Sequence, residues 1–520
     1  MLSTIYNAIR YGGWSGHTMS EKIDMTESKQ FDSTNDKQIT RLDRIILENF
    51  GDRVILKPLT RWNEAYKEFP RYVLEYLCAR YIAPHDPLPG QKKIDRLLQE
   101  HYVESGAKEL IKHRIAEKGE YSLLGPLTLV YDQRRLHYWA EVPALGDSHV
   151  RVSDRVIKEF GDTLLTSGAW GTMKIEFDPN YKIGTHAYPF RVIDFTPFQV
   201  TRLSLEDYIE KRRLFSTQDW IDLLIQTVGF NPTRLSDRVK VLMMLRLVPF
   251  VESNYNLVEL GPRQTGKTYM YKNTSQRAFV VSSGKASAAT LFHHGTSRKV
   301  GLIGVKDVVV FDEIASERTG AQKLNDTTID TLKNYMAQGS YSKDGIEFTS
   351  TCSIVLGGNI NTNLDKRIPT DKYDHLFQPL PEETREDTAF LDRIHAYLPG
   401  WEMPVITPSN YATGYGFISD YVAEIFHLLR RRNYQTHVVA GAVFPEGMSQ
   451  RAHDAIKKTA AGLLKLIYPH RTPDDVEPEE LNFCLSIASE MRQRVADQLK
   501  VIAPQEFQKV SLKYEMRLKS

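Results

Sequence analysis

Cysteine is scarce in this sequence, and long apolar runs are missing from it. The 520 residues include three cysteines, Cys78, Cys352 and Cys484, and none stands in the C-x-x-C spacing typical of metal and redox sites. Because they lie far apart in apolar stretches, we expect buried thiols in a reducing compartment. No segment approaches the roughly 18 apolar residues of a membrane span, and the N-terminus lacks the apolar core of a signal peptide. These absences predict a cytoplasmic protein without a membrane partner.

Neither sign of charge dominates the sequence. There are 67 Lys and Arg residues against 65 Asp and Glu residues, which gives a net charge of +2. This balance excludes a globally basic nucleic-acid coat, but it is compatible with a local basic channel. With 41% hydrophobic residues, a chain of this length should form two or three domains with cores of their own.

One segment carries the most specific signal. It fits the phosphate-binding pattern G-x-x-x-x-G-K-[ST], follows the apolar run 257–260 and precedes a stretch that can continue as a helix. Backbone N–H groups of such a loop wrap nucleotide phosphates, aided by the positive end of the helix. We therefore predict an ATP site in which Lys267 reaches the β- and γ-phosphates and the Thr268 hydroxyl holds Mg²⁺. The predicted phosphate-binding residues are Gly261, Pro262, Arg263, Gln264, Thr265, Gly266, Lys267 and Thr268.

Two further strands are predicted to bring polar residues to this site. The β-branched run 306–311 ends in Asp312 and Glu313, and such an apolar run is typical of a central parallel strand. We expect Asp312 to hold Mg²⁺ through water and Glu313 to polarise the attacking water. The strand 352–356 ends in Gly-Gly-Asn, which makes Asn359 a candidate for orienting that water. The alternatives are a solvated acidic turn for the first strand and simple turn chemistry for the second.

The pattern of apolar residues changes along the chain. Helical spacing of apolar residues gives way to short strands and then returns, and Ser204 and Ser216 begin helix-capping patterns. Met1 and Met19 are both candidate starts. Aromatic and basic residues in the strand-rich part could bind DNA, or they could equally be core and solvated face. The predicted parts are a disordered tail (1–40), a helical N-terminal domain (41–120), an OB-like β domain (121–203), an α/β ATPase core (204–408), a helical lid (409–472) and a C-terminal helical tail (473–520).

Several linked motifs resemble one family. They are Glu259–Thr268, Val310–Ile314, Tyr335–Ser340, Gly357–Asn361, Leu391–His395 and Tyr397–Trp401. Together they resemble the BrxL family, the Lon-related AAA+ proteins of BREX bacteriophage-defence systems, over roughly residues 41 to 515. The resemblance implies an α/β AAA+ ATPase core, a parallel sheet with a P-loop, and other phage-defence proteins as partners. Family members usually continue into a Lon-protease-like domain where this sequence ends at Ser520, so we do not expect peptide hydrolysis.

The same motifs are more distantly similar to minichromosome-maintenance helicases. Met336–Gly345 resembles the hairpin whose lysine lines the ring pore of those proteins, which makes Lys343 the candidate DNA-binding residue. By the same likeness Arg393 matches the arginine finger and Arg451 matches the second sensor, both near a subunit boundary. The alternatives are an ordinary hairpin turn for Lys343 and a surface salt bridge for each arginine.

These expectations leave more than one class of function open. The first is a ring-forming ATPase, hexameric by analogy and with rings that can stack, which binds DNA or moves along it in phage defence. The second is an ATP-gated DNA-binding scaffold without motor activity. A third is an unfoldase that serves a separate protease, although the sequence has no obvious aromatic and hydrophobic pore loop for it.

Overall fold

The computed structural model describes residues 39–517 with short gaps. The residues outside the described part are 1–38, 62–65, 67, 68, 84, 85, 103–105, 134, 167, 199–202, 283–285, 295–298, 316–325, 344, 364–367 and 518–520. The predicted disordered tail, apart from residues 39 and 40, therefore lies outside the described residues, as do both candidate starts.

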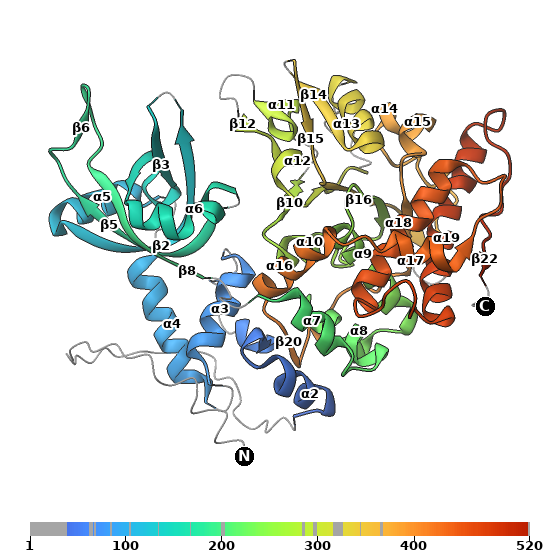
Figure 1. The fold of residues 1–520 in the computed structure, drawn as a ribbon, viewed down its shortest axis with the longest axis horizontal. Helices are drawn as coiled ribbons and strands as arrows, with labels where there is room; N and C mark the ends of the chain where they lie inside the picture. Colours follow the sequence, from blue (N-terminus) through green and yellow to red (C-terminus); the bar gives the residue numbers. More distant parts are fainter. Residues whose placement is uncertain are drawn as a thin grey trace. The chain divides into compact units, whose positions relative to one another are not determined.

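Helices dominate the N-terminal part, drawn in blue in Figure 1. They are α2 (Arg41–Phe50), α3 (Arg71–Tyr81), α4 (Pro87–His101) and α5 (Lys108–Lys118). Helix α2 begins at a capping box in which Thr40 and Asp43 each satisfy a backbone N–H of the other. The short strand β1 (Val54–Leu56) pairs antiparallel with β20 (Tyr415–Phe417). This pairing joins the N-terminal part to a segment far along the chain.

A buried charge network fixes the same junction. Lys57 donates hydrogen bonds to Glu75 at 2.7 Å and to the carbonyl oxygen of Phe417 at 2.6 Å. Burial lowers the pKa of Lys57 to about 8, although the charge of Glu75 opposes this shift. Arg71 pairs with Glu75 at 2.8 Å, and its guanidinium lies over the ring of Tyr269, 5.7 Å from the ring centre. Residues of the N-terminal helices thus contact residues of the later core directly.

A closed five-stranded barrel follows. Its strands are β2 (Glu120–Asp132), β3 (His137–Val142), β4 (Asp147–Val152), β5 (Ala169–Phe177) and β8 (Phe190–Pro197), with helix α6 (Asp154–Thr166) between β4 and β5. The strands close in the order β2-β3-β4-β8-β5, and β4 and β8 are the parallel pair. This order, with a helix after the third strand, is that of an OB-fold. The predicted small barrel is therefore confirmed.

The second sheet forms an α/β core. Its strands are β9 (Asn256–Gly261), β10 (Ala278–Val281), β13 (Val308–Phe311), β16 (Ser353–Asn359) and β19 (Ala396–Pro399). They lie in the order β10-β13-β16-β9-β19 and are all parallel. Apart from β10, these strands are buried almost throughout, as expected for a parallel sheet covered on both faces. The predicted α/β core is confirmed.

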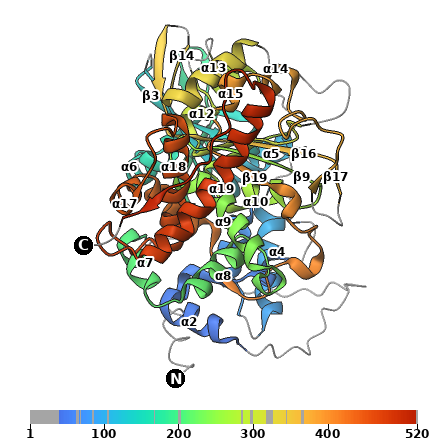
Figure 2. The same cartoon turned by 90° about the vertical axis from the view of Figure 1, so that its right-hand side faces the viewer.

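Helices cover this sheet, and the last of them ends at Ile502, before the short strand β22 (Glu515–Met516). The longer ones are α7 (Leu205–Arg212), α8 (Thr217–Thr227), α9 (Asp237–Val251), α10 (Lys267–Thr274), α13 (Asp326–Gln338), α16 (Ser419–Arg430), α17 (Gln435–Gly441), α18 (Gln450–Ile467) and α19 (Pro478–Ile502). Helix α9 is buried from Val239 to Val251 and packs against α16 and α18. Helix α19 packs against α18 and β19, on the side that faces the viewer in Figure 2.

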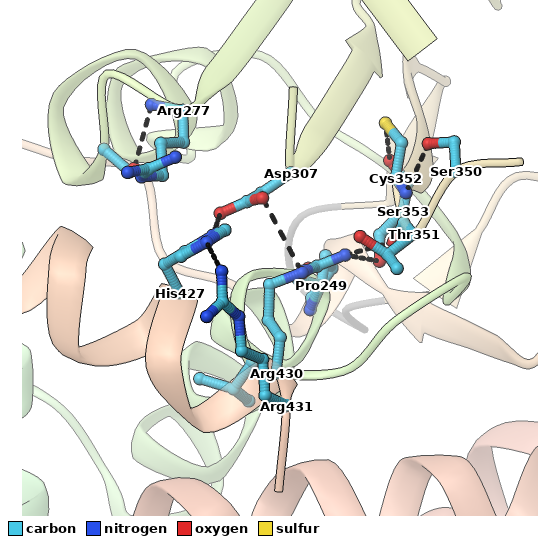
Figure 3. A network of polar contacts seen from close by, with 12 residues as sticks. Pro249, Arg277, Asp307, Ser350, Thr351, Cys352, Ser353, His427, Arg430 and Arg431 are labelled. Atoms are coloured by element: carbon cyan, nitrogen blue, oxygen red, sulfur yellow. Dashed lines mark hydrogen bonds and ion pairs between the residues drawn. The ribbon is translucent and has the colours of Figure 1, made fainter. Parts of the chain in front are cut away.

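A polar network ties α16 to the amino end of the sheet (Figure 3). Asp307, which precedes β13, lies 2.8 Å from His427 and 3.8 Å from the guanidinium of Arg430. Arg430 also donates to the carbonyl oxygens of Pro249 and Thr351. Burial disfavours the charged form of Asp307, but the hydrogen bond from His427 and the charge of Arg430 outweigh burial and lower its pKa. The network therefore holds a buried carboxylate in its ionised form.

The structure shows where the three cysteines lie and whether a described helix could span a membrane. Cys78, Cys352 and Cys484 are free and buried, and burial raises the pKa of each thiol, so the prediction of buried thiols is confirmed. In the part of the chain that is described, no helix has both the length and the apolar character needed to cross a membrane.

Candidate nucleotide-binding site

The segment 261–268 forms a loop between a buried strand and a helix. It leaves the carboxyl end of β9 and enters α10 at Lys267. Gln264 and Gly266 have positive φ angles of 62° and 77°, and Gly266 is the N-cap of the helix. A Cβ atom at Gly266 would also lie 2.9 Å from the ring of Phe230. Glycine is thus required there both by the backbone angle and by close packing.

The predicted phosphate-binding residues differ in exposure. Gly261, Thr265 and Lys267 are buried. Pro262, Gly266 and Thr268 are half-buried, and Arg263 and Gln264 are exposed. The Nζ atom of Lys267 donates to the carbonyl oxygen of Pro262 at 2.8 Å, and among the described residues it has no ion pair with a carboxylate. Burial lowers the pKa of Lys267, while the charge of Glu259 opposes the shift. A buried ammonium group bonded only to loop oxygens suits an anionic ligand such as a phosphate.

A buried ion pair beneath the loop escaped the sequence reasoning. Arg246 of α9 is fully buried and makes a two-pronged contact with Glu259 of β9, at 2.5 and 2.9 Å. Its Nη1 atom also donates to the carbonyl oxygen of Thr265 in the loop, at 3.0 Å. Arg246 therefore connects a core helix, the strand and the loop. Each of the two residues is a single charge within an apolar run. A charge in such a run is expected to be buried, and a buried charge needs a partner, so this pattern could have indicated the pair.

The two acidic residues stand beside the loop at the carboxyl edge of the sheet. The hydroxyl of Thr268 donates to a carboxylate oxygen of Asp312 at 2.5 Å, and the backbone N–H of Glu313 donates to the other at 3.1 Å. Glu313 is exposed and has a positive φ angle of 58°, an uncommon angle for a residue with a side chain. Hydroxyl and carboxylate oxygens are the ligands that Mg²⁺ prefers, so Thr268 and Asp312 fit that ion.

Asn359 lies at the tip of the neighbouring strand. In the register of β16 and β9 it stands opposite Gly261, the first residue of the loop. A Cβ atom at Gly358 would lie 2.4 Å from the Cβ atom of Ala315, so only glycine lets the turn after Glu313 approach so closely. Residues 357–359 belong to the strand rather than to a loop, because they pair with β9. The sheet thus brings Asn359, the loop and the acidic residues to one edge.

Arg393 and Arg451 lie at the other end of the sheet. The carbonyl oxygen of Arg393 accepts a hydrogen bond of 2.9 Å from the side chain of Asn256, the first residue of β9. At about 3.3 Å per residue, the loop that begins at Gly261 is roughly 16 Å further along that strand. Arg451 pairs at 2.7 Å with Asp392, the neighbour of Arg393 in the chain. The chain therefore brings these two arginines near each other and not to its own loop.

The two arginines differ in how their charges are compensated. Arg451 has the ion pair with Asp392 that the plainer alternative suggested. Arg393 has no ion pair among the described residues, and its Nε atom is buried without a hydrogen-bond partner there. Burial, together with the charge of Arg451, lowers the pKa of Arg393. Within the described chain the guanidinium of Arg393 thus has no carboxylate at ion-pair distance, although the charges of Asp387 and Asp392 act on it.

Lys343 lies near the tip of a hairpin. Strands β14 (Ser340–Lys343) and β15 (Ile346–Thr349) pair antiparallel, and Lys343 stands opposite Ile346, which is half exposed at 50%. The base of the hairpin is held where Tyr341 stacks on Phe348, with ring centres 5.2 Å apart. The chain enters β16 directly after the hairpin, at the amino end of the sheet. Lys343 therefore extends from the end opposite the phosphate loop.

Comparisons with known proteins agree on one family. Residues 190–513 match the sequence model described as "Lon-like protease BrxL-like, ATPase domain", and residues 48–177 match "BREX system Lon protease-like protein BrxL N-terminal". The chain is 38% identical over 471 residues to the Lon-like protease BrxL of Bacillus cereus (strain H3081.97), covering 90% of this chain and 68% of the relative. It is 34% identical over 476 residues to the Lon-like protease BrxL of Escherichia coli O9:H4 (strain HS), covering 91% and 67%.

Among solved structures, the chain is similar to that of a full-length MCM homologue from Methanopyrus kandleri. It is 11% identical, with a TM-score of 0.40, and the likeness covers 72% of this chain and 78% of that one.

Fold, loop and family matches define a protein with an ATPase domain on an α/β core and a small barrel before it. The chain belongs to the BrxL family of Lon-like proteins from BREX systems. The resemblance drawn from the motifs is thereby confirmed.

Proposed function

We propose that this chain is a Mg²⁺-dependent ATP hydrolase of the AAA+ type. One observation carries the proposal: Lys267 and Thr268 of the loop lie beside Asp312 and Glu313, with Thr268 bonded to Asp312 at 2.5 Å. Lys267 would compensate the phosphate charge, and Glu313 would accept a proton from the attacking water. Asn359 would orient that water from the tip of β16. A Mg²⁺ ion held by Thr268 and Asp312 would neutralise charge on the phosphates.

We also propose that the working form is a closed ring, six-fold by analogy and open to stacking. Support comes from the separation of about 16 Å between Arg393 and the loop of the same chain. A neighbouring copy is the natural source of the arginine that an ATPase site uses against phosphate charge. In a head-to-tail ring each copy would offer Arg393 and Arg451 to the next copy's loop. Helices α16, α17 and α18 would form the lid.

The proposed polymer partner is DNA, and the proposed role is phage defence in the cytoplasm together with other defence proteins. Membership of the BrxL family supports the defence role. Lys343 supports DNA binding, because a hairpin tip repeated around a ring would collect positive charge on one axis. In a motor, ATP hydrolysis would drive movement along DNA. In a scaffold, ATP would control assembly on DNA without movement. The absence of peptide hydrolysis stays a prediction.

The test replaces the proposed general base. Glu313→Gln should abolish ATP turnover, because losing a well-placed base costs about 10²–10⁴ in rate, while nucleotide binding persists. Glu446→Gln, which changes an exposed carboxylate elsewhere, should turn ATP over like wild type. Turnover and binding of a fluorescent ATP analogue would be measured side by side. A Glu313→Gln protein that hydrolyses ATP at the wild-type rate would refute the assignment.

A further inference from the structure

The turn that carries Arg393 is bound by a residue of the strand that leads to the phosphate loop. This turn, residues 392–395, follows helix α15 (Thr388–Leu391) and precedes β19; we call it the arginine turn. The side chain of Asn256, the first residue of β9, donates to the carbonyl oxygen of Arg393 at 2.9 Å. The backbone N–H of Asn256 donates to Nδ1 of His395, and its carbonyl oxygen accepts from the N–H of His395, both at 2.9 Å. The arginine turn is therefore fixed to the amino end of β9.

Arg492 of α19 holds the same turn from a second element. It is buried, and its Nη1 atom donates to the carbonyl oxygen of Asp392 at 3.1 Å and to that of Ile394. Its Nη2 atom donates to the carboxylate of Asp392. The three consecutive carbonyl oxygens of residues 392–394 are thus all bound by buried side chains of other elements. Such support is what holds a functional side chain in a productive geometry.

Asp392 is shared by two arginines whose surroundings differ. One of its carboxylate oxygens accepts from Arg492, and the other pairs with Arg451 at 2.7 Å. The side chain of Arg492 is 2% exposed, whereas that of Arg451 is 52% exposed. Because an exposed ion pair contributes little, Arg451 can leave Asp392 at low cost. Arg492 would still compensate the carboxylate, which would otherwise be a buried charge without a partner.

The side chain of Arg393 is bound much less than its backbone. Its Nη1 atom donates to the carbonyl oxygen of Ala389, and its Nε atom is buried without a partner among the described residues. The two carboxylates whose charges act on it are bonded to other cations: Asp387 to Lys333 at 2.9 Å, and Asp392 to the two arginines. A guanidinium on a fixed backbone, without an ion pair of its own in the described chain, is suited to an anion from another molecule.

We propose that Arg492, together with Asn256, is a positioning residue for ATP hydrolysis in the neighbouring subunit. It fixes the arginine turn, so that Arg393 meets the phosphates of the neighbour's nucleotide in one geometry. It also keeps Asp392 compensated when Arg451 moves from that carboxylate to a phosphate. Asn256 ties the turn to β9, the strand that ends in the subunit's own phosphate loop. The inference rests on the proposed ring, and it adds residues that touch no nucleotide themselves.

The test begins with Arg492→Met in the full-length protein. ATP turnover of the folded fraction should fall about 10²-fold, the loss typical of a group misplaced by about 1 Å, while a fluorescent ATP analogue should bind as to wild type. Arg430→Met is the matched control, because Arg430 is also buried and binds a carboxylate and two carbonyl oxygens (Figure 3). The control should lower stability to urea in a similar way and keep wild-type turnover in the folded fraction.

Subunit mixing separates an effect on the neighbour from an effect on the fold. In an equimolar mixture of Arg492→Met and Lys267→Ala, about a quarter of the interfaces of a head-to-tail ring join an intact loop to an intact arginine turn, so about that fraction of turnover should return. A mixture of Arg492→Met and Arg393→Ala should stay inactive, because every arginine turn is defective. The double variant Arg492→Met with Asp392→Asn should behave the same in both mixtures. It leaves no buried carboxylate without a partner, so it serves where Arg492→Met alone does not fold.

The outcomes distinguish this inference from the proposed function. Wild-type turnover by the Arg492 variants, with turnover lost in Arg393→Ala, would overturn the inference and leave the proposed ring standing. If Arg393→Ala recovers with Lys267→Ala but the Arg492 variants do not, Arg492 acts only on the fold of its own subunit, and the inference is again overturned. Full turnover by Arg393→Ala alone would overturn both the inference and the arginine proposed to act across the interface.

Discussion

The buried pair of Arg246 and Glu259 should matter to ATP binding as well as to stability. Both side chains are almost completely buried, at 0% and 1% exposure, and Arg246 also holds the loop carbonyl of Thr265 at 3.0 Å. Removing one partner of a buried pair typically costs about 3–5 kcal/mol, because the remaining charge has no compensation. Arg246→Met should therefore lower the free energy of unfolding by about that amount.

A double variant separates the two roles of the pair. Arg246→Met with Glu259→Leu leaves no buried charge, so most of the stability should return. The carbonyl of Thr265 would still lack its donor, and a hydrogen bond to a charged group contributes about 1.5–3 kcal/mol. If even half of that energy fixes the loop, the KM for ATP should rise several-fold. Urea unfolding and ATP titration of turnover measure the two effects.

A second buried pair supplies the control. Lys465 on α18 and Glu252 at the end of α9 are 2.7 Å apart and are also deeply buried. Both residues lie away from the loop. Lys465→Met should destabilise the protein comparably and leave the KM for ATP unchanged in the folded fraction. If both arginine variants bind ATP as Lys465→Met does, the contact of Arg246 with the loop has no functional role.

Two further perturbations test other parts of the account. Lys343→Ala should flatten the salt dependence of duplex binding, because each lost phosphate contact removes about 0.7–0.9 from the slope of log K. Basal ATP turnover of this variant should equal that of wild type, and the control Lys509→Ala, which removes an exposed lysine, should show the wild-type slope. An unchanged slope for Lys343→Ala would mean that the hairpin has only a structural role. The lowered pKa of Asp307 contributes stability that is present above the ordinary aspartate pKa of about 3.9 and is lost as pH falls through the folded value. Urea unfolding should therefore show a steep loss of stability below about pH 4 that Asp307→Asn flattens; an equally steep loss in the variant would contradict the role of His427 and Arg430.

The parts predicted well from the sequence are those whose chemistry is local in the chain. The phosphate loop and the acidic residues after β13 are short patterns that follow apolar strands, and the sheet places them together as expected. Ser204 and Ser216 cap helices α7 and α8 for the same reason, since a cap involves neighbours three residues apart.

The parts that were missed depend on partners far apart in the chain. Arg246 and Glu259 are each a single charge within an apolar run, and only the fold, which brings α9 to β9, makes them a pair. Strand β1 pairs with β20, which lies far along the chain, and its three residues are too few to give a periodic signal. The roles of Asn359, Arg393, Arg451 and Lys343, and the domain boundaries, stay predictions.

The most direct measurement of the central claim, an ATP site completed by a second copy, is a subunit-mixing experiment. Arg393→Ala and Lys267→Ala should each abolish turnover alone, the first through the neighbour's site and the second through its own. Random one-to-one mixing places an intact loop beside an intact arginine at about a quarter of the interfaces in a head-to-tail ring, so turnover should return to about that fraction. Mixing Lys267→Ala with Glu313→Gln, two defects on the same side of the interface, should restore nothing. Full turnover by Arg393→Ala alone, or no recovery in the first mixture, would contradict the account.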